Sequence, residues 1–353
     1  MDSDSPGARH PTGLIRFAGR MPGNPHFFRR REHMDTRVQH RKRRLAAFAV
    51  LGGLLHAGAR AFSTERPYPK RPIALTVGYP PGGGADILAR SLGEYLAREL
   101  KQKVVVHNKP GAASNIAAEA VAHARPDGYT LYISTRANTI HKTMYGNFDF
   151  DVASDFAPVG VLAKVPNVIV TASGTFIATI ADLIAFASAH PGRLTYASTG
   201  VGSDTHLLGE LFQQQTGIEL LHVPYRGGAA AMADVISGRV DMLIFSLPGS
   251  LPYIKAGAVR AIALMSDARL PAIEDTPTLA EAGVPGVNLE TWFGLMAPAG
   301  TPQPVIAKLN EAVNTVLMNP GLRATLAGRG YVVPLSASRH VVGGEHRCVA
   351  ESP

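Results

Sequence analysis

The sequence is short of cysteine and of long apolar segments. Cys348 is the only thiol in 353 residues, so the chain cannot form an internal disulfide. After residue 61 no apolar run approaches the roughly 18 residues that indicate a membrane-spanning helix. The sequence therefore predicts neither a disulfide framework nor a membrane span in the body of the chain.

The body of the chain also lacks a surplus of charge. The net charge is +8, from 35 basic and 27 acidic residues, but residues 1–61 hold twelve of the basic and four of the acidic groups. The remaining residues carry 23 groups of each sign. Because nucleic-acid binding depends on clustered surplus cations, this neutral body excludes a DNA- or RNA-binding protein.

Motifs of enzymes and metal sites are missing as well. The loop Gly82–Gly84 continues as Ala85-Asp86-Ile87, without the Gly-Lys-Ser/Thr ending that a nucleotide-binding loop needs. No G-x-S-x-G nucleophile elbow and no H-x-x-x-H metal spacing occurs. Ser203, Asp204 and His206 crowd together, but neighbours at a helix start face different directions, and Ser203 is better explained as a helix cap. We predict no catalytic residue, metal or cofactor.

Residues 1–61 are predicted to be an N-terminal extension and signal peptide. Arg41–Arg44 precede the apolar run Leu45–Leu55, and a small-residue stretch then ends in an A-x-A site at Ala61. We expect cleavage after Ala61 and, from the length of the signal, a start at Met34. Because no cysteine comes directly after the apolar run, where a lipid could be attached, the mature chain is predicted to be periplasmic, soluble and not lipid-anchored. The alternative is a disordered basic tail.

After residue 67 the chain alternates strands with helices. Leu88, Leu92, Leu96 and Leu100 recur every four residues and predict an amphipathic helix over 85–100. Further helices are predicted at 114–124, 180–190, 204–214, 229–237 and 306–317, and strands at 73–77, 104–107, 130–135, 168–171, 194–198, 220–223, 240–245 and 259–265. This order predicts doubly wound α/β domains with mostly parallel sheets.

Two glycine-containing helix starts stand out, at Pro80–Asp86 and Ser198–Ser203. If both face one cleft, two helix dipoles and their free N–H groups converge there, which suits a small carboxylate. Asp86 would repel that carboxylate, so we interpret it as a loop-orienting acceptor or as a partner for a ligand ammonium group.

Ten motifs in order then carry a family resemblance. They are Tyr68–Pro72, Pro80–Asp86, Gly111–Asn115, Asp127–Thr130, Asp155–Val159, Gly202–Leu207, Val223–Gly227, Gly238–Asp241, Pro277–Gly283 and Trp292–Pro302. With these, the chain resembles the Bug family, the solute receptors of tripartite tricarboxylate transporters, over about residues 67–335.

The resemblance implies a type II periplasmic binding protein fold, in which two doubly wound α/β domains close over a ligand cleft about a two-strand hinge. Domain 1 would comprise 67–165 with 289–353, and domain 2 would comprise 166–288. The residues that it implies for the ligand site are Pro81, Gly82, Gly83, Asp86, Asn115 and Thr135 in domain 1, and Thr199, Gly202, Ser203, His206 and Tyr225 in domain 2. After Leu335 the chain departs from the family's pattern, so its last helix is predicted to be truncated or altered.

These features predict a monomeric extracytoplasmic receptor that delivers a small carboxylate to a membrane permease. A tricarboxylate, a dicarboxylate, an amino acid or an aromatic acid would each fit, and the sequence does not choose among them. Two alternatives stay open: an exported hydrolase or transferase on the same scaffold, and a carboxylate sensor for a signalling partner.

Overall fold

The computed structural model describes residues 68–140, 148–289 and 291–337, all within the unit Arg66–Pro353. The predicted signal peptide, with its start at Met34 and its cleavage after Ala61, lies outside the described residues, as does the C-terminal stretch after Ala337. In the described part of the chain, no helix is both long and apolar enough to cross a membrane.

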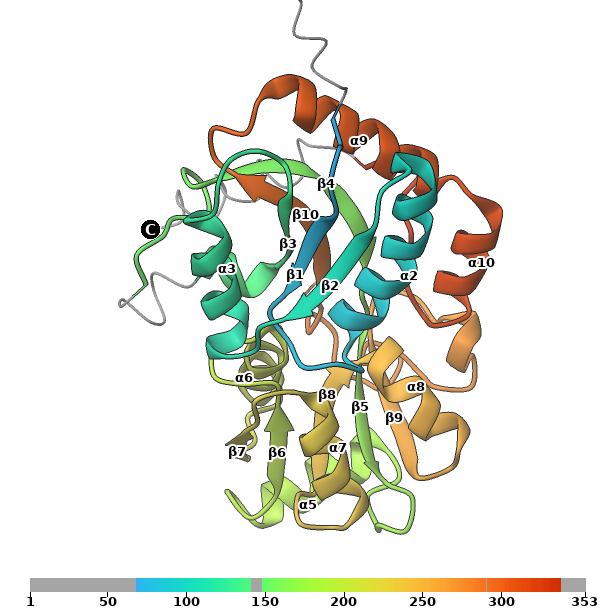
Figure 1. Ribbon diagram of the computed structural model, residues 1–353. Helices are drawn as coiled ribbons and strands as arrows, with labels where there is room; N and C mark the ends of the chain where they lie inside the picture. The colour runs from blue at the N-terminus through green and yellow to red at the C-terminus, as the bar shows by residue number, and fades with distance from the viewer. Residues whose placement is uncertain (1–67, 141–147, 290, 338–353) are drawn as a thin grey trace, which may run out of the picture. The chain divides into compact units, whose positions relative to one another are not determined.

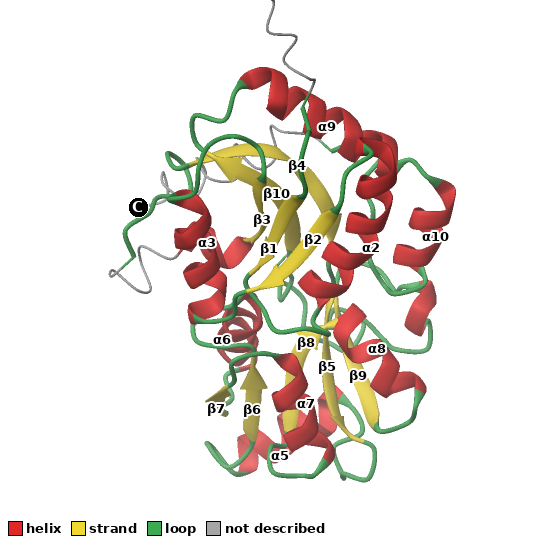
Figure 2. Ribbon diagram, in the orientation of Figure 1, coloured by secondary structure: helices red, strands yellow, loops and turns green. Residues whose placement is uncertain are grey.

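The strands form two five-stranded sheets (Figure 2). The first has the order β2-β1-β3-β10-β4, and the second has the order β7-β6-β8-β5-β9. The strands of the first sheet are β1 (Ile73–Val77), β2 (Val104–Asn108), β3 (Thr130–Thr135), β4 (Phe156–Lys164) and β10 (Trp292–Pro298). Those of the second are β5 (Asn167–Ala172), β6 (Thr195–Ser198), β7 (Leu221–Pro224), β8 (Met242–Ser246) and β9 (Val259–Met265).

Both sheets are mixed, so the prediction of mostly parallel sheets is wrong. Strands β1, β2 and β3 pair in parallel, as do β6, β7 and β8, because helices connect successive strands of each group. By contrast β10 runs antiparallel to β3 and β4, and β5 runs antiparallel to β8 and β9. Strands β4 and β10, which the sequence analysis missed, connect directly to the other half of the chain, so no crossover helix fixes their direction.

Helices cover the sheets (Figure 1). They are α2 (Gly84–Leu100), α3 (Asn115–Ala122), α5 (Ile180–Ala189), α6 (Asp204–Thr216), α7 (Gly228–Ile236), α8 (Leu247–Lys255), α9 (Gln303–Leu317) and α10 (Pro320–Ala327), with short 3-10 turns at Ala112–Ser114, Arg136–Ile140 and Pro271–Ile273. Six of these helices match the predicted ones to within a few residues. The sequence analysis missed α8, which contains Pro252, and the short α10.

The leucine stripe of α2 shows why these elements form. Leu88, Leu92 and Leu96 are at most 2% exposed and pack in the core of the first sheet, together with Leu100. A fully buried leucine contributes roughly 1.5–3 kcal/mol relative to an exposed one. The stripe therefore fixes the rotation of α2 and aims its first turn at the end of β1.

The chain passes between the sheets at two neighbouring segments. It leaves β4 through Val165 and enters β5 at Asn167, and it returns through Thr291 into β10. The N–H of Val165 donates to the carbonyl of Thr291 at 2.8 Å, and Nδ2 of Asn167 donates to Oγ1 of Thr291 at 2.8 Å. The strands thus divide into two sets; the domain boundaries 67–165 with 289–353, and 166–288, stay a prediction.

We expect Thr291→Val to destabilise the protein. The substitution keeps the shape but removes the hydroxyl that Asn167 needs, and a buried polar group left without its partner costs about 1–3 kcal/mol. Chemical denaturation measures the loss, with Thr315→Val on the exposed face of α9 as the matched control. An unchanged free energy of unfolding would show that the two crossing segments do not depend on this hydrogen bond.

Candidate functional site

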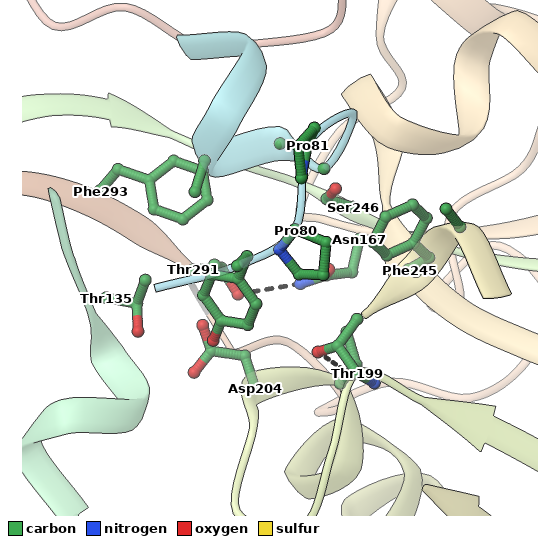
Figure 3. Close-up of a pocket in the computed structure, with 17 residues that line it drawn as sticks. Pro80, Pro81, Thr135, Asn167, Thr199, Asp204, Phe245, Ser246, Thr291 and Phe293 are labelled. Carbon is green, nitrogen blue, oxygen red and sulfur yellow. Dashed lines mark hydrogen bonds between the residues drawn. The ribbon is translucent and has the colours of Figure 1, made fainter. Parts of the chain in front are cut away.

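A cavity lies between the two sheets and is lined by both (Figure 3). Its residues come from the ends of strands and the turns that follow: Tyr79, Pro80, Pro81, Gly83, Gly84, Ala85, Thr135, Asn167, Thr199, Asp204, Thr205, Gly228, Ala229, Phe245, Ser246, Thr291 and Phe293. Its volume is about 50 Å³. In α/β sheets ligands bind beyond the carboxyl ends of the strands, and β1, β3, β6 and β8 all end at this cavity.

Two helices begin at the cavity without a capping side chain. α2 has Gly83 as its N-cap and α7 has Gly227, and neither helix start receives a side-chain cap from the described residues. The first N–H groups of a helix have no partner within it, and the helix dipole makes that end positive. Gly84 and Gly228 open these helices and line the cavity, so donors from both halves of the chain reach one space.

The two halves touch beside these helix starts. A methyl group added at Gly227 would lie 2.6 Å from Cγ of Pro80. One at Gly84 would lie 2.9 Å from Oγ of Ser246 and 3.5 Å from the ring of Phe293. Glycine is therefore required where the loop after β1 meets the start of α7, and Ser246 lies against the first turn of α2.

The start of α6 differs from the other two. Ser203 caps it: its Oγ accepts from the N–H of His206 at 3.3 Å and donates to the carbonyl of Gly200 at 2.7 Å. The Ser203 side chain is thus used within its own loop, and Ser203 does not line the cavity. The next residue, Asp204, does line it, so this helix start presents an acidic side chain rather than free donors.

Asp204 is the charged group of the cavity wall. It is only 7% exposed, and Oδ1 has no hydrogen-bond partner among the described residues. Burial raises the pKa of Asp204 to about 6, against a hydrogen bond from Thr291 and the positive charge of Arg136, which lower it. Ser246, which is 8% exposed, also has a hydroxyl without a partner in the described part of the chain. Figure 3 shows Asp204 on the side of the cavity that Thr135 and Thr291 also line.

Five of the eleven sequence-predicted site residues line a cavity. Pro81, Gly83, Thr135 and Thr199 line the one just described. Thr199 and Tyr79 also border a second cavity of about 280 Å³, where Tyr225 and Arg226 lie. The hydroxyl of Tyr225 donates to Asp234 at 2.6 Å. Arg226 is exposed at the mouth of this second cavity.

Gly82 and Asp86 shape the loop behind the cavity wall. Gly82 has φ +84°, and its N–H donates to Oδ2 of Asp86 at 3.0 Å. Burial raises the pKa of Asp86, but hydrogen bonds from Arg90, Gly82 and Asn108 outweigh it and leave the pKa below its usual value. Asp86 is therefore an ionised, fully bonded carboxylate that orients the loop, as its loop-orienting interpretation predicts.

His206 and Gly202 belong to the internal structure of the second half. Nδ1 of His206 accepts from the N–H of Gly202 at 3.2 Å, and the imidazole stacks on His222 with ring centroids 4.3 Å apart. Burial lowers the pKa of His206, while the carboxylate of Glu210 opposes that shift. The ring ties α6 to its preceding turn and does not line either cavity.

Asn115 lies in a buried amide network. Its Oδ1 accepts from Nδ2 of Asn138 at 2.9 Å, and Asn138 in turn accepts from the hydroxyl of Tyr132. The preceding residue, Ser114, borders the second cavity. Asn115 thus supports the loop that faces the ligand space without lining either cavity.

The sequence analysis missed the residues that come from β5, β8 and β10. Asn167, Phe245, Ser246 and Thr291 lie at or beside strand ends outside the ten motifs, and Phe293 lies within the motif Trp292–Pro302, which was not interpreted as part of the site. Asp204 was weighed only as a member of a catalytic group. Its position directly after a capping serine in a glycine-rich turn was the signal that could have placed it at the ligand. Within the described ranges, no group of three metal-ligating side chains comes together.

We expect Asp204→Asn to stabilise the ligand-free protein, with a gain that begins above about pH 4 and is complete above about pH 6. Because its pKa is higher in the folded than in the unfolded chain, the contribution of Asp204 to stability is fully present below about pH 4 and is lost as the pH rises through about 6. Asparagine removes that loss, which is worth about 3 kcal/mol at pH 8.

Denaturation between pH 4 and pH 8 measures this difference, with Asp275→Asn on the exposed surface as the control. A change in the free energy of unfolding that is the same at pH 4 and pH 8 would contradict the assignment of a buried, titrating Asp204.

The family model and the sequence relatives that match this chain point to the same family. The profile of the "Tripartite tricarboxylate transporter family receptor" matches residues 88–340. The chain is 36% identical over 291 residues to the UPF0065 protein in the tcbD-tcbE intergenic region of Pseudomonas sp. (strain P51), which covers 82% of this chain and 86% of that protein. It is also 36% identical over 285 residues to Protein BugT of Bordetella pertussis, covering 80% and 87%.

Several solved structures have the same fold as this chain. The periplasmic binding protein BugD superposes with a TM-score of 0.76 at 31% identity, covering 80% of this chain and 94% of BugD. Rpa4515 of R. palustris with adipate gives 0.75 at 34% identity, covering 81% and 98%. MatC of Rhodopseudomonas palustris with bound malate gives 0.75 at 29% identity, covering 79% and 96%. The two mixed α/β sheets are those of a type II periplasmic binding protein, which confirms the predicted fold class.

Proposed function

Because the chain belongs to the tripartite tricarboxylate transporter receptor family, we propose that it captures a small carboxylate outside the cytoplasm and delivers it to a membrane permease. Among the solved relatives, BugD is a periplasmic binding protein, and Rpa4515 and MatC hold adipate and malate. The observation that carries the proposal for this chain is the pair of uncapped helix starts, α2 and α7, that face one cavity from opposite sheets.

The ligand carboxylate is assigned to the donors between these helix starts. The first N–H groups of α2 and α7 and the hydroxyl of Ser246 offer donors around one point, where Phe245 and Phe293 reduce access of water. A carboxylate accepts about four hydrogen bonds, and a buried site of this kind satisfies it without a cationic side chain. The names of two solved relatives, with adipate and with malate, support a carboxylate in this fold.

Ligand entry requires the two halves to separate. A cavity of about 50 Å³ is far below the roughly 300–1,000 Å³ of ligand pockets. The two crossing segments at Val165 and Thr291 are the only chain connections between the halves within the described residues, which supports a hinge at these segments. Capture by closure is the behaviour that a receptor handing its ligand to a permease needs.

An exported enzyme finds less support. Ser203 and His206, the hydroxyl and imidazole that the sequence brings together, are engaged in a helix cap and a ring stack. Neither lines the cavity. Acyl-transfer chemistry needs a nucleophile and a base that meet at the substrate, and the described wall of this cavity offers hydroxyls beside a carboxylate but no imidazole or thiol.

Thermal unfolding against a panel of ligands tests the proposed function. The probes are L-alanine, L-aspartate, L-glutamate, malate, adipate and citrate, with glucose and putrescine as controls. A carboxylate at about 100 times its dissociation constant should add about 2.7 kcal/mol and raise the melting temperature by several degrees. A sharp transition that moves with none of the carboxylates, or equally with glucose, would contradict a carboxylate receptor.

Gly227→Ala tests whether the site is built from both halves. The added methyl group meets the rigid ring of Pro80 at 2.6 Å, so the walls cannot approach fully and the affinity for the carboxylate should fall at least about tenfold. Gly174→Ala, in an exposed turn where a methyl group meets nothing within 4 Å, is the control. Unchanged affinity in Gly227→Ala would place the ligand away from the start of α7.

A further inference from the structure

Resting on the proposed carboxylate site, we propose that Asp204 binds the ammonium group of the ligand, so that this receptor takes a small amino acid rather than a carboxylate without an amino group. The inference concerns the second pole of the cavity, opposite the donors of α2 and α7. It assigns a specificity-determining role to a residue that the family resemblance did not mark.

The first support is an acceptor that the protein leaves unused. Asp204 is 93% buried, being 7% exposed, and it lines the cavity, yet its Oδ1 has no hydrogen-bond partner among the described residues. A hydrogen bond from Thr291 favours the ionised form of the carboxylate, and the Thr291 hydroxyl accepts in turn from Asn167. A buried acceptor without a donor is costly. The carboxylate at the cavity wall therefore keeps one buried oxygen, Oδ1, for which the described residues offer no donor.

The second support is the division of the cavity into donors and an acceptor. The starts of α2 and α7 supply backbone donors and the hydroxyl of Ser246 can donate as well, whereas Asp204 supplies only acceptors when ionised. An amino acid carries a carboxylate and an ammonium group on one carbon atom, and so it complements both poles. A dicarboxylate would place a negative group against Asp204, where like charges repel.

A protonated Asp204 that donates to a ligand carboxylate is the competing arrangement. Burial favours the protonated form, but Arg136 and the hydrogen bond from Thr291 both favour the ionised form. The donors for the carboxylate are already present at the opposite pole, so a further donor at Asp204 has no function there. The two arrangements predict opposite results when Asp204 is replaced by asparagine, because asparagine keeps a donor and loses the negative charge.

Calorimetry with matched pairs of probes tests the inference. The pairs are L-alanine with propanoate, L-aspartate with succinate, and L-glutamate with glutarate, each titrated into the purified wild type and the variants Asp204→Asn and Asp275→Asn. For the pair that binds, we expect the amino acid to bind at least about 30-fold more tightly than its deaminated partner, since an unpaired buried charge costs that much or more. Asp204→Asn should lose this preference, while Asp275→Asn keeps it.

Proton exchange gives a second readout that a structural role for Asp204 would not move. At pH 6 an ammonium group beside Asp204 drives it to the ionised form, so binding releases protons, whereas a carboxylate beside it drives proton uptake. Titration in buffers of different ionisation enthalpy measures the sign. Proton release on binding to the wild type that is absent with Asp204→Asn supports the inference.

The outcomes separate the two proposals. Binding of a deaminated carboxylate as tightly as its amino acid, retained in Asp204→Asn, would overturn the ammonium assignment and leave the carboxylate receptor standing. Binding of no probe with or without an amino group, by a protein that melts cooperatively, would overturn the receptor function and this inference together.

Discussion

Unsatisfied backbone donors at the starts of α2 and α7 are the constraint on which the site depends. Both helices begin at glycine, Gly83 and Gly227, and glycine has no side chain to cap them. Buried N–H groups need a partner, and here that partner has to enter from the cavity. The leucine stripe of α2 and the packing of α7 against β8 hold these donors in place before a ligand arrives, so little ordering is needed on binding.

Oδ1 of Asp204 is also a buried hydrogen-bonding atom without a partner among the described residues, but it is an acceptor rather than a donor. A buried carboxylate with an open oxygen lowers stability at neutral pH, and no packing advantage of aspartate over asparagine offsets that loss. Sequences retain such residues where function requires them, because strain and unpaired charge concentrate at ligand sites. The hydrogen bond from Thr291 ties this charge to the segment that joins the two sheets. The acceptor of the site and the proposed hinge therefore share one residue.

Local patterns predicted the parts of this protein that local physics determines. The four-residue leucine spacing located α2, and residues of the glycine loop before it line the cavity. Local patterns did not predict which helix start of the second half lies at the same cavity as α2. The sequence analysis expected α6 to provide the second donor set, because Gly200–Ser203 resembles an anion loop, yet Ser203 uses its hydroxyl to cap α6 and α7 lies at the cavity instead. Thr291 and Asn167 are more than a hundred residues apart, and only the fold brings them together.

Because α7 rather than α6 supplies the second set of backbone donors, two different parts of the cavity can bind the carboxylate and determine which ligand is preferred. The donors come from backbone at glycine positions, where side chains can change little without closing the cavity, as the close approaches at Gly84 and Gly227 show. The first turn of α6 faces the same cavity with a side chain, and a side chain can be replaced without moving the backbone. Recognition of the carboxylate therefore follows from the fold, whereas recognition of the rest of the ligand follows from residues such as Asp204. For that reason the sequence analysis singled out the loop Pro80–Asp86, which lies at the proposed anion pole, whereas Asp204 was placed at the cavity only by the structure.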